Sequence, residues 1–305
     1  MEKLNRVLSA VARRIGAWPI RAIGTRLRAD VLERLTEETI SVTTIPGNQI
    51  RFYTPSPLLL SRAASVLSKE TDTIQWIDGF EDGAVLWDIG ANVGVYSLYA
   101  AIQRNVSVLA FEPSAANFHV LTRNIHLNKL GDRATGYCIA FSDRTQLGIL
   151  NMASPSMGAA LGQFGQFGEM SRYWEGQTGA AAQGMIGFTI DSFISQFDPP
   201  FPNYLKLDVD GLELPILEGA RMTLRDVRLR SLLVELSVSR ESECRNAHRL
   251  LEEAGFRFVS RGATQGTQTE SAANHLFQRV ACPVMSNQND SNHAVCNAES
   301  AQLAK

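Results

Sequence analysis

The alternation of short apolar runs with helix-like stretches constrains the fold of this chain more than any other feature. After Gly83 the apolar runs AVLWDI, VSVLAF and ATGYCIAF are separated by VGVYSLYAAIQ and AANFHVLTRNIHLN, and the pattern resumes with NYLKLDV and SLLVEL. Strands that alternate with helices of this length form a parallel sheet through right-handed crossovers. The sequence therefore predicts an α/β domain with helices on both faces of a parallel sheet.

The chain divides by pattern into four parts: a basic helical segment (1–38), a hairpin with two short helices (39–82), the α/β domain (83–282) and a disordered tail (283–305). The first 30 residues carry seven basic and two acidic side chains, although the whole chain has a formal net charge of -2. A basic amphipathic helix binds anionic membranes in some proteins and docks on its own domain in others. Both alternatives stay open for residues 1–30.

Composition argues against several classes of protein. The chain has 29 Lys and Arg against 31 Asp and Glu, so we expect no nucleic-acid partner. Its apolar stretches are shorter than the roughly 18 residues that a transmembrane helix needs. The four cysteines form no CxxC motif or Cys/His cluster, which argues against a zinc module and a disulfide scaffold. The expected location is the cytoplasm.

Residues 151–187 interrupt the alternation. They contain eight glycines among aromatic and methionine side chains, including Tyr173 and Trp174. A stretch this long without a clear period is usually either a functional lid or poorly ordered. The aromatic residues favour a lid, because a flexible linker has no need of them. Tyr173 and Trp174 could stack on a sugar ring or could anchor the lid.

The run LWDIGANVGVYS places Asp88 at the end of a predicted strand and four residues in the turn before a helix: Gly90, Ala91, Asn92 and Gly94. Glycines let the backbone approach a ligand, and a helix N-terminus offers free N–H groups. Eighteen residues after Gly94, at the end of the next strand, comes Glu112, which could accept both hydroxyl protons of a ribose. The two features together predict a nucleoside-containing cofactor.

Two cofactors fit this turn, a nicotinamide dinucleotide and S-adenosylmethionine. The dinucleotide fingerprint GxGxxG requires a second glycine where this chain has Asn92. Asp88, two residues before Gly90, could attract the ammonium of an amino acid moiety. Because S-adenosylmethionine has an amino acid tail and no phosphate, the sequence favours it over the dinucleotide.

The block YLKLDVDGLELPILEGA places Lys206, Asp208, Asp210 and Glu213 at the C-terminal end of an apolar strand, where open parallel sheets bind their ligands. Four ionisable groups within eight residues are costly to bury without a function. If the strand continues, only one of Asp208 and Asp210 faces the cleft, unless Gly211 begins a turn. Glu213 could instead be a first-turn acid that complements the helix dipole.

Residues 84–260 resemble the FkbM family of S-adenosylmethionine-dependent methyltransferases, on the combination of DIGANVGVYS, AFEPS, FTIDSF and LKLDVDGLELPILEGA. The resemblance implies the class I methyltransferase fold, a Rossmann-like seven-stranded sheet with one antiparallel edge strand. It also implies O-methylation of hydroxyls on sugars, glycolipids or natural products. The residues carried over to the cofactor site are Asp88, Gly90, Ala91, Asn92, Gly94, Glu112 and Pro113.

This chain departs from the family pattern at two positions. It has DVDG where the family usually has DVEG, so Asp210 is one methylene shorter, and Leu212 stands where His or Ala often follows the glycine. The first change keeps the charge but alters its reach. The second removes a candidate histidine base. These departures keep open a third alternative, a methyltransferase-like binding protein without catalysis, beside the methyltransferase and a nicotinamide-dependent oxidoreductase.

Methyl transfer from a sulfonium to a hydroxyl needs in-line alignment and a proton acceptor. Asp208 and Asp210 are the candidate acceptors, with Glu213 and Lys206 as the orienting pair. A divalent metal held by Asp208 and Glu235 is an alternative, but two acids form no recognisable metal motif, and we expect no metal. The remaining titratable residues that we expect to be structural are His119, His126, His248 and Cys138.

Overall fold

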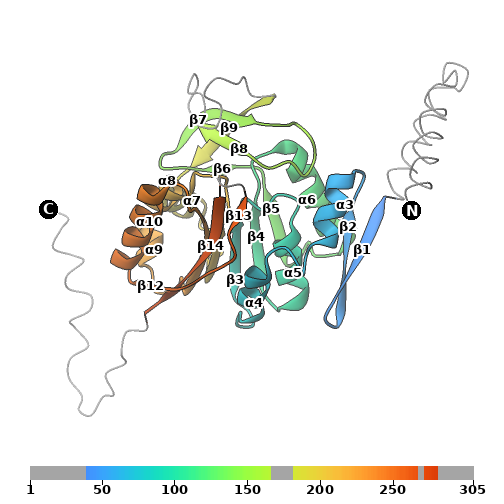
Figure 1. Ribbon diagram of the computed structural model, residues 1–305, viewed down its shortest axis with the longest axis horizontal. Helices are drawn as coiled ribbons and strands as arrows, with labels where there is room; N and C mark the ends of the chain where they lie inside the picture. Colours follow the sequence, from blue (N-terminus) through green and yellow to red (C-terminus); the bar gives the residue numbers. More distant parts are fainter. Residues whose placement is uncertain (1–38, 166–180, 267–270, 281–305) are drawn as a thin grey trace, which may run out of the picture.

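The computed structural model describes residues 39–165, 181–266 and 271–280 (Figure 1). The predicted basic helical segment, the predicted disordered tail, and both Tyr173 and Trp174 lie outside these described residues. Among the helices of the described ranges, none combines the length and the hydropathy needed to cross a membrane.

The main sheet confirms the expected α/β architecture. Seven strands lie in the order β12-β14-β11-β10-β3-β4-β5, and the two-residue strand β13 (Gln265–Gly266) pairs with β14. The seven strands are β3 (Val85–Ile89), β4 (Ser107–Phe111), β5 (Ala134–Tyr137), β10 (Tyr204–Leu207), β11 (Ser231–Ser237), β12 (Phe256–Arg261) and β14 (Ser271–Arg279). The five strands from β11 to β5 are parallel.

The antiparallel strand does not lie at the edge, contrary to our expectation. β14 runs antiparallel to both of its neighbours, β11 and β12, and β12 is the strand at this edge of the sheet. Burial explains this order. β14 buries consecutive residues that face both sides of the sheet, such as Asn274 and His275, whereas only Phe256 of β12 is buried. The polar strand therefore takes the solvent-facing edge.

Two hydrophobic cores fill the two faces of the sheet. On one face Leu86 and Val108 pack with side chains of α4 (Thr71–Asp78), α5 (Val95–Gln103) and α6 (Ala115–Leu127). On the other face Trp87 and Leu109 pack with α7 (Ile190–Phe197), α8 (Glu213–Glu218), α9 (Arg221–Arg225) and α10 (Glu241–Glu253). Neighbouring residues of a strand point to opposite faces, which produces this division. Trp87 is fully buried in the second core.

A hairpin and a helix precede the sheet. β1 (Ile40–Ile45) and β2 (Asn48–Tyr53) pair antiparallel around Gly47, as the turn residues predicted. Helix α3 (Pro57–Ala64) follows and begins at Ser56, whose side chain accepts a hydrogen bond from the Leu59 amide. The hairpin is tied to α6, because the Tyr53 amide donates to Asn124 Oδ1 at 2.7 Å. This arrangement brings α3 beside the candidate site.

Within the predicted lid (151–187), the described residues 151–152, 162–165 and 181–187 belong to strands of a second sheet, so these parts have regular structure, and the lid itself stays a prediction. The order of this sheet is β6-β9-β7-β8, with β6 (Ala140–Phe141), β7 (Gln146–Met152), β8 (Gly162–Gly165) and β9 (Ala181–Phe188). Several glycines serve packing: a Cβ on Gly187 would lie 2.3 Å from the ring of Phe164, and one on Gly148 would lie 2.8 Å from it. Figure 1 shows this sheet above the main sheet.

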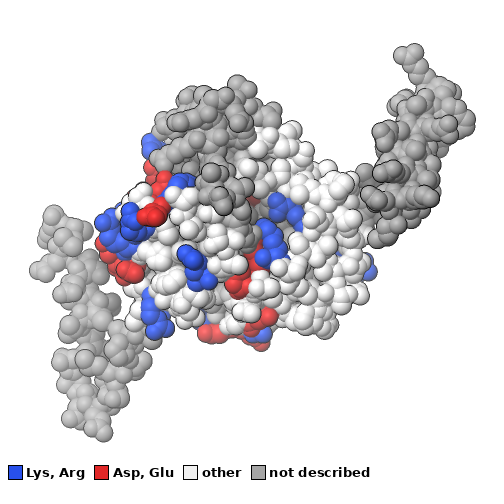
Figure 2. Space-filling model, in the orientation of Figure 1, with Lys and Arg blue, Asp and Glu red and all other residues white. Residues whose placement is uncertain are grey.

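The surface of the described residues carries charges of both signs. On the face drawn in Figure 2, basic and acidic side chains lie beside each other over α10. The ion pair between Arg245 and Glu241, at 3.0 Å and one helical turn apart, is an example. Alternating charges of this kind are typical of a solvated helix face.

Candidate active site

Two glycines let the turn after β3 lie against its neighbours. Gly90 has a φ of +84°, and a Cβ there would lie 1.8 Å from the backbone oxygen of Asp208. Gly94 has a φ of +85°, and a Cβ there would lie 2.5 Å from Leu121 of α6. L side chains rarely adopt this backbone region, so glycine is required at both positions. The first glycine holds the turn after β3 against the turn after β10, and both turns line one cavity.

The cavity has a volume of about 150 Å³. Its lining includes most of the predicted site residues and several that the sequence did not indicate: Arg62, Lys69, Gly90, Asn92, Glu112, Pro113, Ser114, Asn117, Leu150, Met152, Ser154, Ala159, Ala160, Gly162, Asp208, Val209, Asp210 and Glu235. A larger cavity of about 480 Å³ lies elsewhere, against Trp76 and Arg230. It contains none of the predicted site residues, so the smaller cavity is the candidate active site.

Glu112 is buried at the end of β4 and binds the turn after β3. Its carboxylate accepts hydrogen bonds from the amide of Asn92 at 2.8 Å, the amide of Ser114 at 2.8 Å and Nδ2 of Asn117 at 3.3 Å. Burial raises the pKa of Glu112 to about 7, although these hydrogen bonds oppose the rise. A carboxylate offers about four acceptor positions, so one remains for a ligand hydroxyl.

Asn92 supplies a second acceptor in the same place. Its Oδ1 atom is buried and makes no hydrogen bond to any of the described residues, while its Nδ2 atom donates to the backbone oxygen of Ala159. A buried acceptor without a donor is uncommon in folded proteins. Asn92 and Glu112 therefore fit a ligand that carries hydroxyl or amine donors, such as a nucleoside with an amino acid tail.

Asp88 lies beneath this turn rather than in the cavity. It is 1% exposed and accepts a hydrogen bond from Ser97 Oγ at 2.5 Å. Burial raises the pKa of Asp88, and the nearby positive charge of Lys206 opposes that rise. Asp88 is absent from the cavity lining, as are Ala91 and Gly94, so the cofactor contact of Asp88 stays a prediction.

The acids after β10 lie close to one buried cation, Lys206. Lys206 is 2% exposed, and its Nζ atom lies 2.6 Å from Asp208 Oδ2. Burial alone would lower the pKa of Lys206, but the surrounding carboxylates, Asp208 foremost, hold it well above its usual value. Burial would raise the pKa of Asp208, yet the charge of Lys206 and the hydrogen bond from Glu235 hold it below its usual value. Asp208 is therefore ionised.

Glu235, near the C-terminal end of β11, is the acid of this group whose charged form is most disfavoured. The negative charge of Asp208, and then burial, raise the pKa of Glu235 to about 9. In the sequence, Glu235 is predicted only as a partner of Asp208 in the alternative of a bound divalent metal. Its place at the end of an apolar strand, as for Glu112, is the signal that could have found it.

Both Asp208 and Asp210 line the cavity, which resolves the alternative left open by the sequence. The strand ends at Leu207, and the chain then turns, with a φ of 55° at Asp210 and 104° at Gly211. Asp210 Oδ2 accepts a hydrogen bond from the Leu161 amide at 2.6 Å. Burial first, and then the charge of Asp208, raise the pKa of Asp210 to about 6. Asp210 thus links the turn after β10 to the start of β8.

The contacts of Glu213 are with the turn itself. Its Oε1 atom accepts hydrogen bonds from the amides of Val209 at 3.1 Å and Gly211 at 3.0 Å, and the side chain is 5% exposed. Burial raises the pKa of Glu213 to about 7. Glu213 does not line the cavity, so these bonds favour the alternative of a helix-start acid that shapes the turn.

Arg62 and Lys69 are the residues that sequence reasoning missed most completely. Both line the cavity, although they belong to α3 and the segment after it, outside the α/β domain. Arg62 Nε donates to the backbone oxygen of Gly158 at 2.8 Å, and the side chain of Lys69 is half exposed. Their positive charges face a cavity that otherwise contains acids.

Solved methyltransferase structures are similar to this chain at low identity. P. horikoshii TYW2 in complex with MeSAdo matches with a TM-score of 0.41 and 12% identity, over 79% of this chain and 71% of that chain. Precorrin-6y C5,15-methyltransferase from Geobacter metallireducens GS-15 matches with a TM-score of 0.40 and 13% identity, over 75% of this chain and 94% of that chain.

Sequence comparison is more direct. A curated relative, hexuronic acid methyltransferase AglP of Haloferax volcanii, is 30% identical over 164 residues, which cover 53% of this chain and 60% of the relative. The family described as Methyltransferase FkbM domain matches residues 88–258, more than half of the chain. That match confirms the resemblance inferred from the motifs, and it removes the oxidoreductase alternative. The chain belongs to the FkbM methyltransferase family, it has the class I methyltransferase fold, and its cofactor is S-adenosylmethionine.

Proposed function

We propose that this methyltransferase methylates a hydroxyl group of a sugar-containing acceptor, with Asp210 as the proton acceptor. The observation that carries the proposal is the contact between Gly90 and Asp208, which places the cofactor turn and the acidic turn around one cavity. If a methyl donor and a hydroxyl are both held in that cavity, in-line positioning can supply on the order of 7 kcal/mol of rate acceleration.

The charges of the acids favour Asp210 over Asp208 as the base. A general base works best when its pKa lies near the operating pH. The pKa of Asp210 is about 6, so this carboxylate is ionised at neutral pH and still takes up a proton readily. Asp208 is held in its charged form by Lys206, which makes it a weaker base and a fixed negative charge for orienting the acceptor.

The cofactor site rests on Glu112 and Asn92. When bound, S-adenosylmethionine supplies an electrophilic methyl group on a positively charged sulfur. The free acceptor position of Glu112 and the unpartnered Oδ1 of Asn92 suit its ribose hydroxyls and its ammonium group. The buried acids around the cavity suit its positive charge.

A saccharide acceptor is supported by the curated relative, whose name gives hexuronic acid as its substrate. Arg62 and Lys69 at the cavity would attract the carboxylate of such a sugar. Glycolipid and natural-product hydroxyls are the other acceptors within this proposal.

Methyl transfer from labelled S-adenosylmethionine to a panel of uronic-acid and neutral glycosides tests the proposal. We expect transfer to the hydroxyl of a saccharide, identified by mass spectrometry of the product. Asp210→Asn keeps an oxygen that accepts from the Leu161 amide but removes the base, so it should lower kcat by about 100-fold or more.

Asp210→Glu is the matched control, because it restores the acid that the FkbM pattern usually has. We expect this variant to retain at least a tenth of the wild-type kcat. The wild-type kcat should fall as the pH drops through about 6, since the base is then protonated. Full activity of Asp210→Asn would remove Asp210 from the mechanism, and transfer to no saccharide in the panel would remove the acceptor class. The cytoplasmic location and the membrane contact of residues 1–30 stay predictions.

A further inference from the structure

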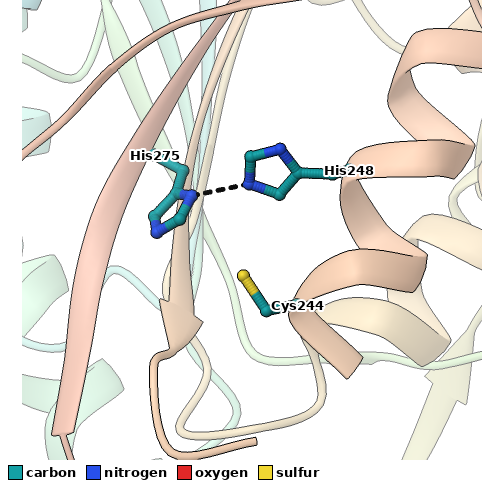
Figure 3. Close-up of side chains that lie close together, drawn as sticks. All are labelled: Cys244, His248 and His275. Carbon is teal, nitrogen blue, oxygen red and sulfur yellow. Dashed lines mark hydrogen bonds between the residues drawn. The ribbon is translucent and has the colours of Figure 1, made fainter. Parts of the chain in front are cut away.

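Three side chains that bind soft divalent metals meet between α10 and β14, away from the methyl-transfer cavity. Cys244 and His248 lie four residues apart on α10, so they share one face of the helix, and His275 reaches them from β14. One ligand atom from each residue lies within 4.8 Å of the other two. Figure 3 shows the sulfur of Cys244 pointing toward the two imidazole rings.

The two rings contact each other directly. His248 Nε2 lies 2.8 Å from His275 Nδ1, so the rings share one proton between two nitrogens (Figure 3). His275 is 5% exposed, and its second nitrogen, Nε2, is buried without a hydrogen-bond partner among the described residues. The nitrogen that faces His248, Nδ1, is the one available to an ion held between the two rings.

The donor types and the spacing suit zinc. Thiolate sulfur and imidazole nitrogen are its preferred ligands, at about 2.3 Å and about 2.0–2.1 Å. A tetrahedral ion would hold the two nitrogens about 3.3 Å apart, so the present 2.8 Å separation needs to open by only about 0.5 Å. The three protein ligands leave one position of the tetrahedron for water.

We propose that Cys244, His248 and His275 form a zinc-binding site that clamps α10 to β14. The ion would take the place of the proton that the two imidazoles share, and it would bind the sulfur as thiolate. Both helix and strand then hold the same ion, so the site links the last helix of the domain to the one antiparallel strand of the main sheet.

The surroundings agree with this assignment. The rings of Phe258 and Phe277 pack around His248, with centroids 5.0 and 4.9 Å away.

No pattern in the sequence indicates this site. Cys244 and His248 form a pair four residues apart, but the third ligand comes 27 residues after His248, from a different element. Its contact with α10 exists only because β14 inserts between β11 and β12. From the sequence alone, His248 is predicted to be structural, and the spacing of the four cysteines argues against a zinc module.

Cobalt titration of the full chain, freed of metal by chelation, tests the proposal. We expect one equivalent of Co²⁺ to bind with the visible absorption bands of a tetrahedral site and a near-ultraviolet thiolate charge-transfer band. Zn²⁺ should displace the cobalt and raise the melting temperature. Cys244→Ser should abolish the charge-transfer band and lower zinc affinity by at least about 100-fold. His275→Asn should abolish the tetrahedral bands.

The matched control replaces the other three cysteines, Cys138, Cys282 and Cys296, by serine and should keep both the band and the zinc affinity. Circular dichroism of each metal-free variant confirms that it is folded. The proposal is overturned if cobalt gives no charge-transfer band, if Cys244→Ser retains it, or if the triple control variant loses it.

Discussion

Replacing Glu112 by Gln should weaken cofactor binding and stabilise the free protein at the same time. Burial raises the pKa of this carboxylate from 4.5 to about 7, so ionising it in the folded protein is unfavourable. A raised carboxylate pKa means that the folded state loses stability as the pH rises between about 4.5 and 7. The loss approaches about 3.4 kcal/mol above pH 7, at about 1.36 kcal/mol for each unit of pKa difference.

Glutamine is neutral and nearly isosteric, so Glu112→Gln removes this penalty. We expect the variant to be more stable than the wild type by roughly 1–3 kcal/mol at pH 8 and to differ little from it at pH 5. The lower end applies because the glutamine NH₂ group replaces one carboxylate oxygen and cannot accept, so the hydrogen bond from the amide of either Asn92 or Ser114 is lost. Urea denaturation at both pH values measures the difference.

Glu112→Gln should weaken cofactor binding, although it stabilises the free protein. A charge-assisted hydrogen bond from a ribose hydroxyl contributes about 1.5–3 kcal/mol, so its loss should weaken S-adenosylmethionine binding by roughly ten- to a hundredfold at pH 8. Wild-type affinity should fall as the pH drops below about 7, where Glu112 takes up a proton, and the Gln variant should lack this step. Calorimetric titration at several pH values would refute the ribose assignment if the two proteins bind the cofactor equally at pH 8.

Two further substitutions test the contacts that assemble the site. Gly90→Ala would place a Cβ 1.8 Å from the backbone of Asp208, so it should lower the stability of the fold by about 4 kcal/mol or more. Gly83 has a φ of +74° but lies in open space, so Gly83→Ala should lower the stability by only about 1–2 kcal/mol. Thermal denaturation measures both effects. Lys206→Met leaves buried acids without their cation and should lose about 3–5 kcal/mol in urea denaturation. Lys69→Met is its control, because that half-exposed lysine should contribute less than about 1 kcal/mol.

The sequence was most informative where chemistry sits at the end of a strand. Glu112 and Asp208 each follow a run of apolar residues, and the carboxyl ends of parallel strands meet at one edge of the sheet. Their proximity therefore follows from the alternation of strands and helices alone. The need for glycine at position 90 does not follow from this alternation, because the close approach of Asp208 depends on how two neighbouring strands are aligned.

Contacts that depend on distant packing were not predictable. The glycines between residues 151 and 187 suggested a lid without regular structure, yet Gly187 lies in a strand, where its lack of a side chain makes room for the ring of Phe164. Local pattern cannot distinguish a glycine that confers flexibility from one that accommodates a ring. Arg62 likewise reaches the cavity only because the hairpin packs on α6 and carries α3 with it.

The balance of charge in the cavity has a consequence for turnover. Asp208, Asp210, Glu112 and Glu235 line it, and Lys206 is the buried cation beside them. A positively charged cofactor relieves the repulsion among these acids, but methyl transfer leaves a neutral thioether, so the reaction removes the charge that favoured binding. We therefore expect S-adenosylmethionine to bind more tightly than its demethylated product above pH 7. That preference should shrink below about pH 6, where Asp210 and Glu112 are protonated, and calorimetry that finds it independent of pH would contradict this electrostatic account.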